Sequence, residues 1–114
     1  MTNVVSPLFT PAETANFLAG KAVASATSFL DGRSTADVMR ADADRLMHEL
    51  LAVDHQSDAN AILDPARLLV LSMMRTARAS ERWRLDRWQQ VTAALVELVR
   101  RESTDLRERG VQRS

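Results

Sequence analysis

Residues 85–109 read LDRWQQVTAALVELVRRESTDLRER. The apolar and semi-apolar positions of this stretch recur at gaps that alternate between three and four residues: Leu85, Trp88, Thr92, Leu95, Val99, Glu102 and Leu106. This period is typical of a helix that packs one side against other helices. The stretch therefore predicts the longest helix of an all-α domain, with the remaining helices folded against it.

Patterns upstream predict three further helices, so we expect a four-helix bundle-like domain over residues 1–114. The predicted helices cover about residues 11–30, 35–53, 65–79 and 86–109, and residues 1–9 and 111–114 are expected to be loose ends. Thr10, Pro11 and Glu13 form a typical helix start with a capping box, and Ser34 is the expected cap of the second helix. Gly32 suits the turn between these two helices.

The boundaries of the last two helices depend on turn signals. Residues 54–60 (DHQSDAN) predict a loop, after which Pro65 restarts the helix, and Leu63 and Leu68 have the spacing of a hydrophobic staple. A continuous helix from 65 to 109 would be about 67 Å long, far more than a compact domain needs. We therefore expect a turn between residues 79 and 86, capped by Ser80 or Asp86, and a final helix end at Gly110.

The third predicted helix is apolar on nearly every side. Its consecutive large side chains are Leu68, Leu69, Val70, Leu71, Met73 and Met74. A helix of this kind is buried on more than one side. Two interpretations stay open: it is the innermost helix of the bundle, or a second copy of the chain covers part of it.

Composition narrows the function classes. The 114 residues include no cysteine, which excludes disulfides, thiolate zinc sites and cysteine nucleophiles. A signal peptide would require basic residues near the N-terminus, but none precedes Lys21. The most apolar early stretch, residues 17–30, is too short and contains too many polar residues to span a bilayer. We expect a cytoplasmic protein without a membrane segment.

Charge is distributed unevenly along the chain. Residues 1–64 hold four basic and nine acidic side chains, and residues 65–114 hold eleven basic and six acidic ones. One interpretation is that the two halves face each other in the fold, so that their opposite charges partly compensate each other across the helix rims. The other is that a basic surface meets an acidic partner.

No stretch carries a specific catalytic signature. There is no Gly-x-Ser-x-Gly motif and no glycine-rich phosphate loop, so we predict no catalytic residues and no cofactor, although an enzyme remains an open alternative. His48 and His55 lie seven residues apart near several aspartates, but the helical period places both on the outward side. Metal ligands in bundles project inward, so we predict surface histidines and no metal site.

Arginines and both tryptophans gather between the last two predicted helices. The cluster comprises Arg75, Arg78, Arg82, Trp83, Arg84, Arg87 and Trp88. The favoured interpretation places the tryptophans in the core at the end of the bundle, with the arginines as a solvated rim. The alternatives are an anchor for a protein partner, because tryptophan and arginine often serve as such anchors, or a site where arginines hold phosphates and tryptophans stack on bases.

The sequence therefore predicts a small, non-catalytic helical adaptor or regulator. We expect it to self-associate, as a homodimer, and to bind another protein through residues 75–88. The alternative is a nucleic-acid-binding regulator that uses the same arginines.

Overall fold

Four α-helices follow one another along the chain in the computed structural model. The structure describes the backbone of residues 10–54 and 57–113 and the side chains of residues 10–54 and 59–108. The helices span Pro11–Leu30 (α1), Ala36–Leu51 (α2), Ser57–Arg78 (α3) and Arg82–Arg113 (α4). No strand occurs in these backbone ranges. The prediction of an all-α, four-helix bundle-like fold is confirmed.

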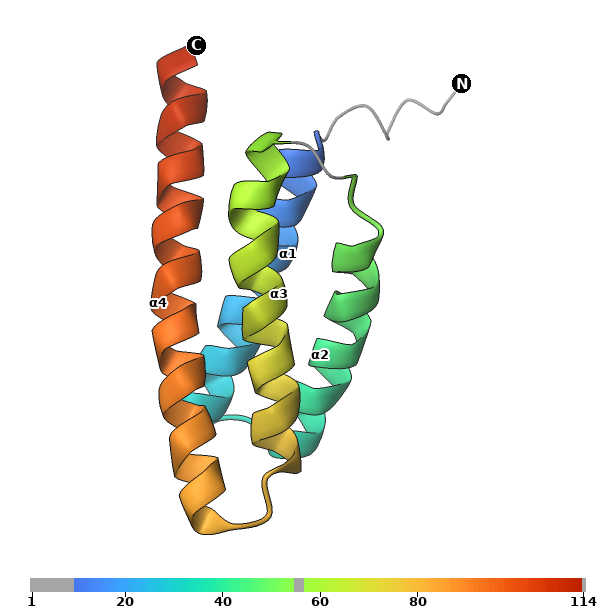
Figure 1. The fold of residues 1–114 in the computed structure, drawn as a ribbon, viewed down its shortest axis with the longest axis vertical. Coiled ribbons are helices and arrows are strands. Elements are labelled where there is room, and N and C mark those ends of the chain that lie inside the picture. Colours follow the sequence, from blue (N-terminus) through green and yellow to red (C-terminus); the bar gives the residue numbers. More distant parts are fainter. Residues whose placement is uncertain (1–9, 55–56, 114) are drawn as a thin grey trace.

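The helices run up and down, so that each is antiparallel to the next (Figure 1). Both α1 and α3 contact all three other helices, whereas α2 and α4 make no contact with each other in the described residues. The pair α1–α3 therefore forms the middle of the bundle, with α2 on one side and α4 on the other. The third helix has the central position of the first of the two interpretations, and it shares this position with α1.

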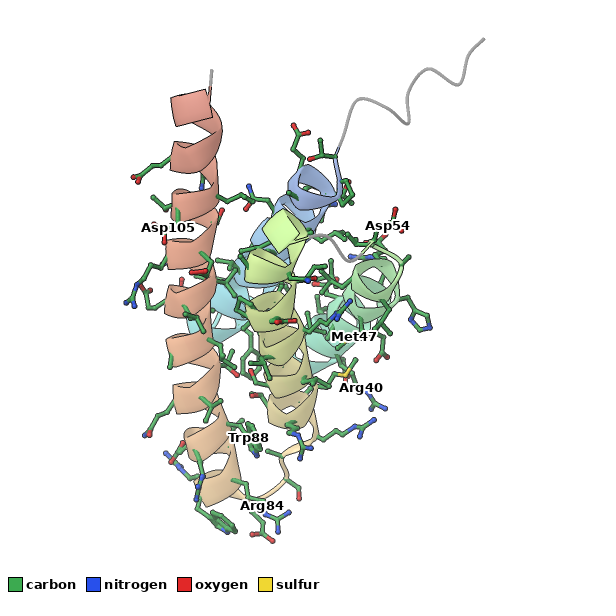
Figure 2. The ribbon with its side chains drawn as sticks, turned by 45° about the horizontal axis from the view of Figure 1, so that its top comes forward. Arg40, Met47, Asp54, Arg84, Trp88 and Asp105 are labelled. Carbon is green, nitrogen blue, oxygen red and sulfur yellow. The ribbon has the colours of Figure 1, made fainter. Side chains whose placement is uncertain are left out.

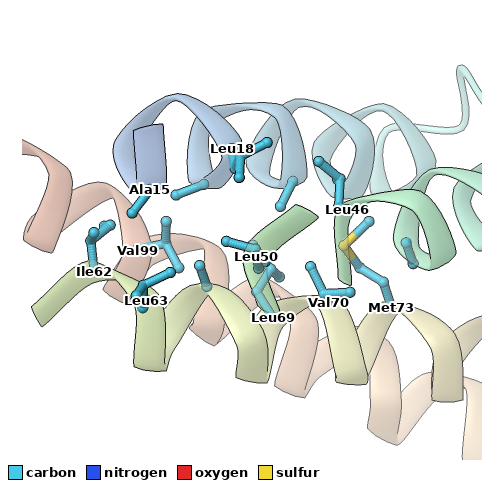
Figure 3. Packing of buried hydrophobic residues seen from close by; sticks show 14 of the residues in the cluster. Ala15, Leu18, Leu46, Leu50, Ile62, Leu63, Leu69, Val70, Met73 and Val99 are labelled. Atoms are coloured by element: carbon cyan, nitrogen blue, oxygen red, sulfur yellow. The ribbon is translucent and has the colours of Figure 1, made fainter. Parts of the chain in front are cut away.

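All four helices contribute to one hydrophobic core (Figure 3). The buried side chains of α1 are mostly small, since four of the five are alanines. Small side chains let the neighbouring helices come close. Larger side chains from α2 and α3 fill the space opposite: Met39, Leu46, Leu50, Ile62, Leu63, Leu69, Val70 and Met73. The buried residues of α1 and of α2 thus lie at helical spacing, on one face of each helix.

Local signals explain the ends of α1 and α2. Thr10 and Glu13 form the predicted capping box, in which each side chain accepts the other residue's backbone N–H. Gly32, at a φ of 77°, makes the turn after α1, a conformation that glycine adopts without steric cost. The cap of α2 is Thr35, not the predicted Ser34, and α2 ends at Leu51, before the predicted end at residue 53.

Helix α3 begins at Ser57, eight residues before the predicted start at Pro65. Residues 57–60 of the predicted loop are helical, and Pro65 lies inside the helix. The predicted staple is also wrong, because Leu63 is buried within α3 whereas Leu68 is 52% exposed. Burial of Ala59, Ile62 and Leu63 at helical spacing outweighs the backbone hydrogen bond that a proline inside a helix loses.

Helix α4 begins at Arg82, four residues before the predicted start. The break at residues 79–81 falls within the predicted window of 79–86, but Asp86 lies inside the helix and is not its cap. The helix continues through Gly110 to Arg113, so the predicted end at Gly110 is wrong, whereas a loosely held tail from residue 111 stays a prediction. Residues 1–9 and Ser114, which were also expected to be loose, lie outside the described residues.

A buried cluster of hydroxyl groups lies where α4 packs against α3. The Thr92 hydroxyl lies 2.8 Å from that of Ser72 and 3.1 Å from that of Thr76. Ser72 and Thr76 also donate to backbone carbonyls of α3, so these buried side chains have partners without leaving the interface. About three turns farther along the same side of α4, the Ser103 hydroxyl donates to the side-chain oxygen of Asn16 on α1.

Candidate protein-binding surface on helices α3 and α4

The predicted arginine–tryptophan cluster lies at one end of the bundle. Arg75 and Arg78 are in the last turn of α3, and the other five members belong to the first two turns of α4. The connection at residues 79–81 brings these turns together, and Figure 2 labels Arg84 and Trp88 at this end. The structure thus unites residues that the sequence predicts as one site.

Part of the cluster surrounds a shallow depression of about 320 Å³ between α3 and α4. Its lining consists of Leu71, Met74, Arg75, Arg78, Ala79, Arg84 and Trp88. The guanidinium carbon of Arg75 lies 5.3 Å from the centre of the Trp88 ring, within the range of a cation–π contact. The depression therefore offers apolar surface bordered by positive charge.

The rest of the cluster lies outside this depression. Arg82, Trp83 and Arg87 do not line it, and Trp83 is 60% exposed. The Trp83 indole N–H donates to the carboxylate of Glu81, and the Arg84 guanidinium lies 5.2 Å from the centre of the Trp83 ring. Arg84 is thus the residue that links the depression to the exposed indole.

The expectation that both tryptophans are core residues is wrong. Trp83 is exposed and Trp88 is half-buried, while the arginines are exposed, as a solvated rim requires. Smaller or more flexible side chains, Met39, Met73 and Thr76, fill the interior instead. An exposed tryptophan places a large apolar surface in water, so this end of the bundle has apolar surface that no other part of the described chain covers.

Charge at this end is strongly positive. Residues 75–88 hold five arginines against Glu81 and Asp86. Four ion pairs are described, and each joins residues two or three apart in the sequence. None of these four links the acidic first half to the basic second half, so they do not provide the compensation between the halves that was one of the two interpretations.

Apolar side chains extend the surface beyond the cluster. Leu68 and Leu71 on α3 are 52% and 46% exposed, and Leu98 on α4 is 38% exposed. Half-buried Val91 and Leu95 share one side of α4 with Leu98 and Trp88, because these residues are three or four positions apart. The contact of Arg75 with Trp88 shows that this side of α4 borders the exposed side of α3.

We call the surface made by Leu68, Leu71, Val91, Leu95 and Leu98 the outer face. Sequence reasoning identified the apolar character of α3 but missed the contribution of α4. The signal was present, because α4 carries a second set of positions at alternating gaps of four and three: Arg84, Trp88, Val91, Leu95, Leu98, Glu102 and Asp105. The first set, which includes the buried Thr92 and Val99, faces the bundle.

The two histidines that were considered as metal ligands do not form a metal site in the described part of the chain. His48 is exposed on α2, and its Nδ1 lies 2.9 Å from the carbonyl oxygen of Asp44. His55 lies outside the described residues, in which no group of three potential metal ligands is found. What the surface on α3 and α4 can do is bind: guanidinium groups pair with carboxylates or phosphates, and the apolar positions accept apolar side chains.

Comparisons with protein-family models, curated proteins and solved structures found no match to this chain. Of the helices in the described residues, none combines the length and the apolar character that crossing a membrane requires.

Proposed function

We propose that this protein is a non-catalytic helical interaction protein of the cytoplasm, which self-associates and binds another protein through the arginine–tryptophan cluster. The observation that carries the proposal is the exposure of Trp83, with Trp88 only half-buried, among five arginines. Tryptophan and arginine are the residues most often found as binding anchors in protein interfaces. The absence of cysteine is consistent with a reducing compartment.

The chemistry of the cluster indicates what kind of partner fits. Five arginines with two nearby carboxylates favour an acidic segment, and arginine pairs with a carboxylate in a planar, two-point geometry. The exposed indole of Trp83 can contact an apolar side chain of that segment. The partner we expect is therefore an acidic protein segment with an apolar anchor residue.

Affinity capture from the native host tests this anchor. The variant is Trp83→Ala with Arg87→Ala, because both side chains are exposed and no other helix depends on them for packing. The matched control is Phe17→Ala with Arg33→Ala, since Phe17 is also 60% exposed and Arg33 is an exposed arginine remote in sequence from the cluster. We expect the first variant to lose a protein that the wild type and the control both retain. Equal retention by all three chains, with helical content unchanged, would contradict the anchor.

Nucleic acid is the alternative ligand of the same arginines, with Trp83 as an exposed stacking platform. Titration of labelled DNA and RNA at two salt concentrations separates the two candidates. Tight binding that weakens steeply with salt would favour a nucleic acid over a protein as the ligand, because phosphate contacts release counterions. We expect no such binding at low salt.

A further inference from the structure

The outer face has opposite charges at its two ends. Arg75, Arg78, Arg84 and Arg87 lie at the end of the bundle where α3 meets α4. The other end of the same face carries carboxylates, Asp64 on α3 and Glu102 and Asp105 on α4. Figure 2 shows Arg84 and Asp105 near opposite ends of α4. The apolar residues of the outer face lie between these two charged groups.

Both helices carry this pattern at the spacing of a helix that packs against another helix. On α3, Asp64, Leu68, Leu71, Arg75 and Arg78 follow at gaps of four and three, as the second set of positions does on α4. Such alternating gaps keep one stripe of a helix facing a partner helix. No other helix in the described ranges covers the α3 stripe at Leu68 and Leu71, which stay about half-exposed.

The charges are placed symmetrically along each helix. On α3, the level midway between Asp64 and Arg75 lies between Leu69 and Val70. On α4, the level midway between Arg87 and Glu102 lies between Ala94 and Leu95. The pair Arg84 and Asp105 has this same midpoint.

The two midpoints lie within about one helical turn of each other in height. The Thr92 hydroxyl is 2.8 Å from that of Ser72 and 3.1 Å from that of Thr76, so Thr92 is level with the part of α3 between these two residues. The helices are antiparallel, so the α4 midpoint, which lies two and a half residues after Thr92, is level with the turn of α3 that begins at the α3 midpoint. To within about one turn, a single axis across both helices therefore relates arginine positions to carboxylate positions on α3 and on α4.

We propose that a second copy of this chain covers the outer face, in an antiparallel dimer whose two-fold axis crosses α3 and α4 at the level of Leu69–Val70 and Ala94–Leu95. In this arrangement, Arg75 of each copy lies opposite Asp64 of the other. By the rise of 1.5 Å per residue, these two positions are each about 8 Å from the axis level along the helix. Arg87 lies opposite Glu102 and Arg84 opposite Asp105, farther from the axis. The apolar residues of the two outer faces meet in the middle.

Apart from Arg84, which pairs with Glu81 at 4.0 Å, the charges named for this pairing have no ion-pair partner within the described part of the chain. Asp64, Glu102 and Asp105 have no ion-pair partner among the described residues, and the same holds for Arg75, Arg78 and Arg87. A parallel arrangement of two copies would place arginines against arginines, which is unfavourable. Charge complementarity thus selects both a second copy and its antiparallel orientation. This inference rests on the self-association part of the proposed function.

A charge swap on α3 tests the orientation. The variants are Asp64→Arg, Arg75→Glu and the two changes combined, with Asp44→Arg on α2 as a control, since Asp44 is an exposed aspartate off the outer face. Light scattering and sedimentation measure the dimer dissociation constant, and circular dichroism checks that each variant is folded. Each single change places like charges opposite each other at two symmetric sites, which predicts a dimer weaker by roughly tenfold to a hundredfold. The combined change restores opposite charges, so its dimer regains the wild-type affinity.

The outcomes separate this inference from the proposed function. A wild-type chain that stays monomeric overturns both the self-association and the antiparallel dimer. Single variants that dimerise as well as wild type overturn the charge pairing and leave self-association in place. A combined variant that is folded but as weak as the single variants overturns the antiparallel orientation. The control is expected to dimerise like wild type.

Discussion

Helices α1 and α4 both pack on α3, but they are used in opposite ways. In its 20 residues, α1 buries five side chains, four of them alanines. In its 32 residues, α4 fully buries Thr92, Val96 and Val99 among the side chains that the structure describes. Other apolar residues of α4, such as Trp88, Val91 and Leu98, stay half-buried or exposed. The comparison teaches that α1 mainly serves the fold, whereas α4 divides its apolar surface between the core and the outside.

Truncation of one leucine on each helix is expected to show the largest difference. Leu18 on α1 is 5% exposed and Leu98 on α4 is 38% exposed. Leu18→Ala removes buried apolar surface and leaves a cavity, so it should lower the free energy of unfolding by about 2–5 kcal/mol. Leu98→Ala should cost clearly less in the monomer. Urea unfolding at low protein concentration measures the free energy of unfolding of both variants. Equal losses would mean that Leu98 contributes as much to the monomer fold as Leu18 does, which would contradict the comparison.

Enlargement of one side chain on each helix should have the next largest effect. Ala22 is completely buried on α1, where the neighbouring helices approach closely. Ala22→Leu forces extra methyl groups into a filled space, with an expected cost of about 1–3 kcal/mol. Val91→Leu on α4 is the matched control, because Val91 is half-buried and its extra methyl group can point to solvent. Thermal unfolding checks the pair, and an Ala22→Leu variant as stable as wild type would show that α1 is not closely packed.

The smallest of these effects concerns the hydroxyl cluster between α3 and α4. Thr92→Val keeps the shape of the side chain and removes its hydroxyl, while Ser72 and Thr76 keep their bonds to backbone carbonyls. The expected cost is about 0.5–1.5 kcal/mol, the net contribution of one hydrogen bond. Chemical unfolding measures it, with Thr104→Val on the exposed side of α4 as control. A stabilised Thr92→Val variant would mean that the cluster is present at a cost in stability.

Much of this fold follows from the sequence, because the core faces are periodic. The buried residues of α1 and α2 recur at helical spacing in the sequence, and the excessive length of a continuous helix over 65–109 predicts the break before α4. The start of α3 could not be predicted in the same way. Local signals at Asp64–Pro65 favour a helix start, whereas burial of Ile62 and Leu63 against other helices, a tertiary effect, extends the helix toward its N-terminus.

The candidate site was predicted as a cluster in sequence but not as a surface in space. Residues 75–88 were identified by their composition, yet the position of Trp83 outside the core depends on how α4 rotates against α3. That rotation buries Thr92 against Ser72 and Thr76, together with Val96 and Val99, an arrangement that composition does not reveal. The second set of positions on α4 is visible as a pattern in the sequence, but without the fold nothing shows which of the two sets faces the bundle.

The most direct test of the central claim, that the outer face is an interface between two copies, is the mass of the protein in solution. Light scattering on wild type, Leu68→Asp and Val38→Asp makes the comparison, because Leu68 on the outer face and Val38 on α2 are both 52% exposed. We expect wild type and Val38→Asp at twice the 12.7 kDa chain mass, and Leu68→Asp at the mass of one chain with its helices intact. A monomeric wild type, or a Leu68→Asp variant that still dimerises, would contradict the claim.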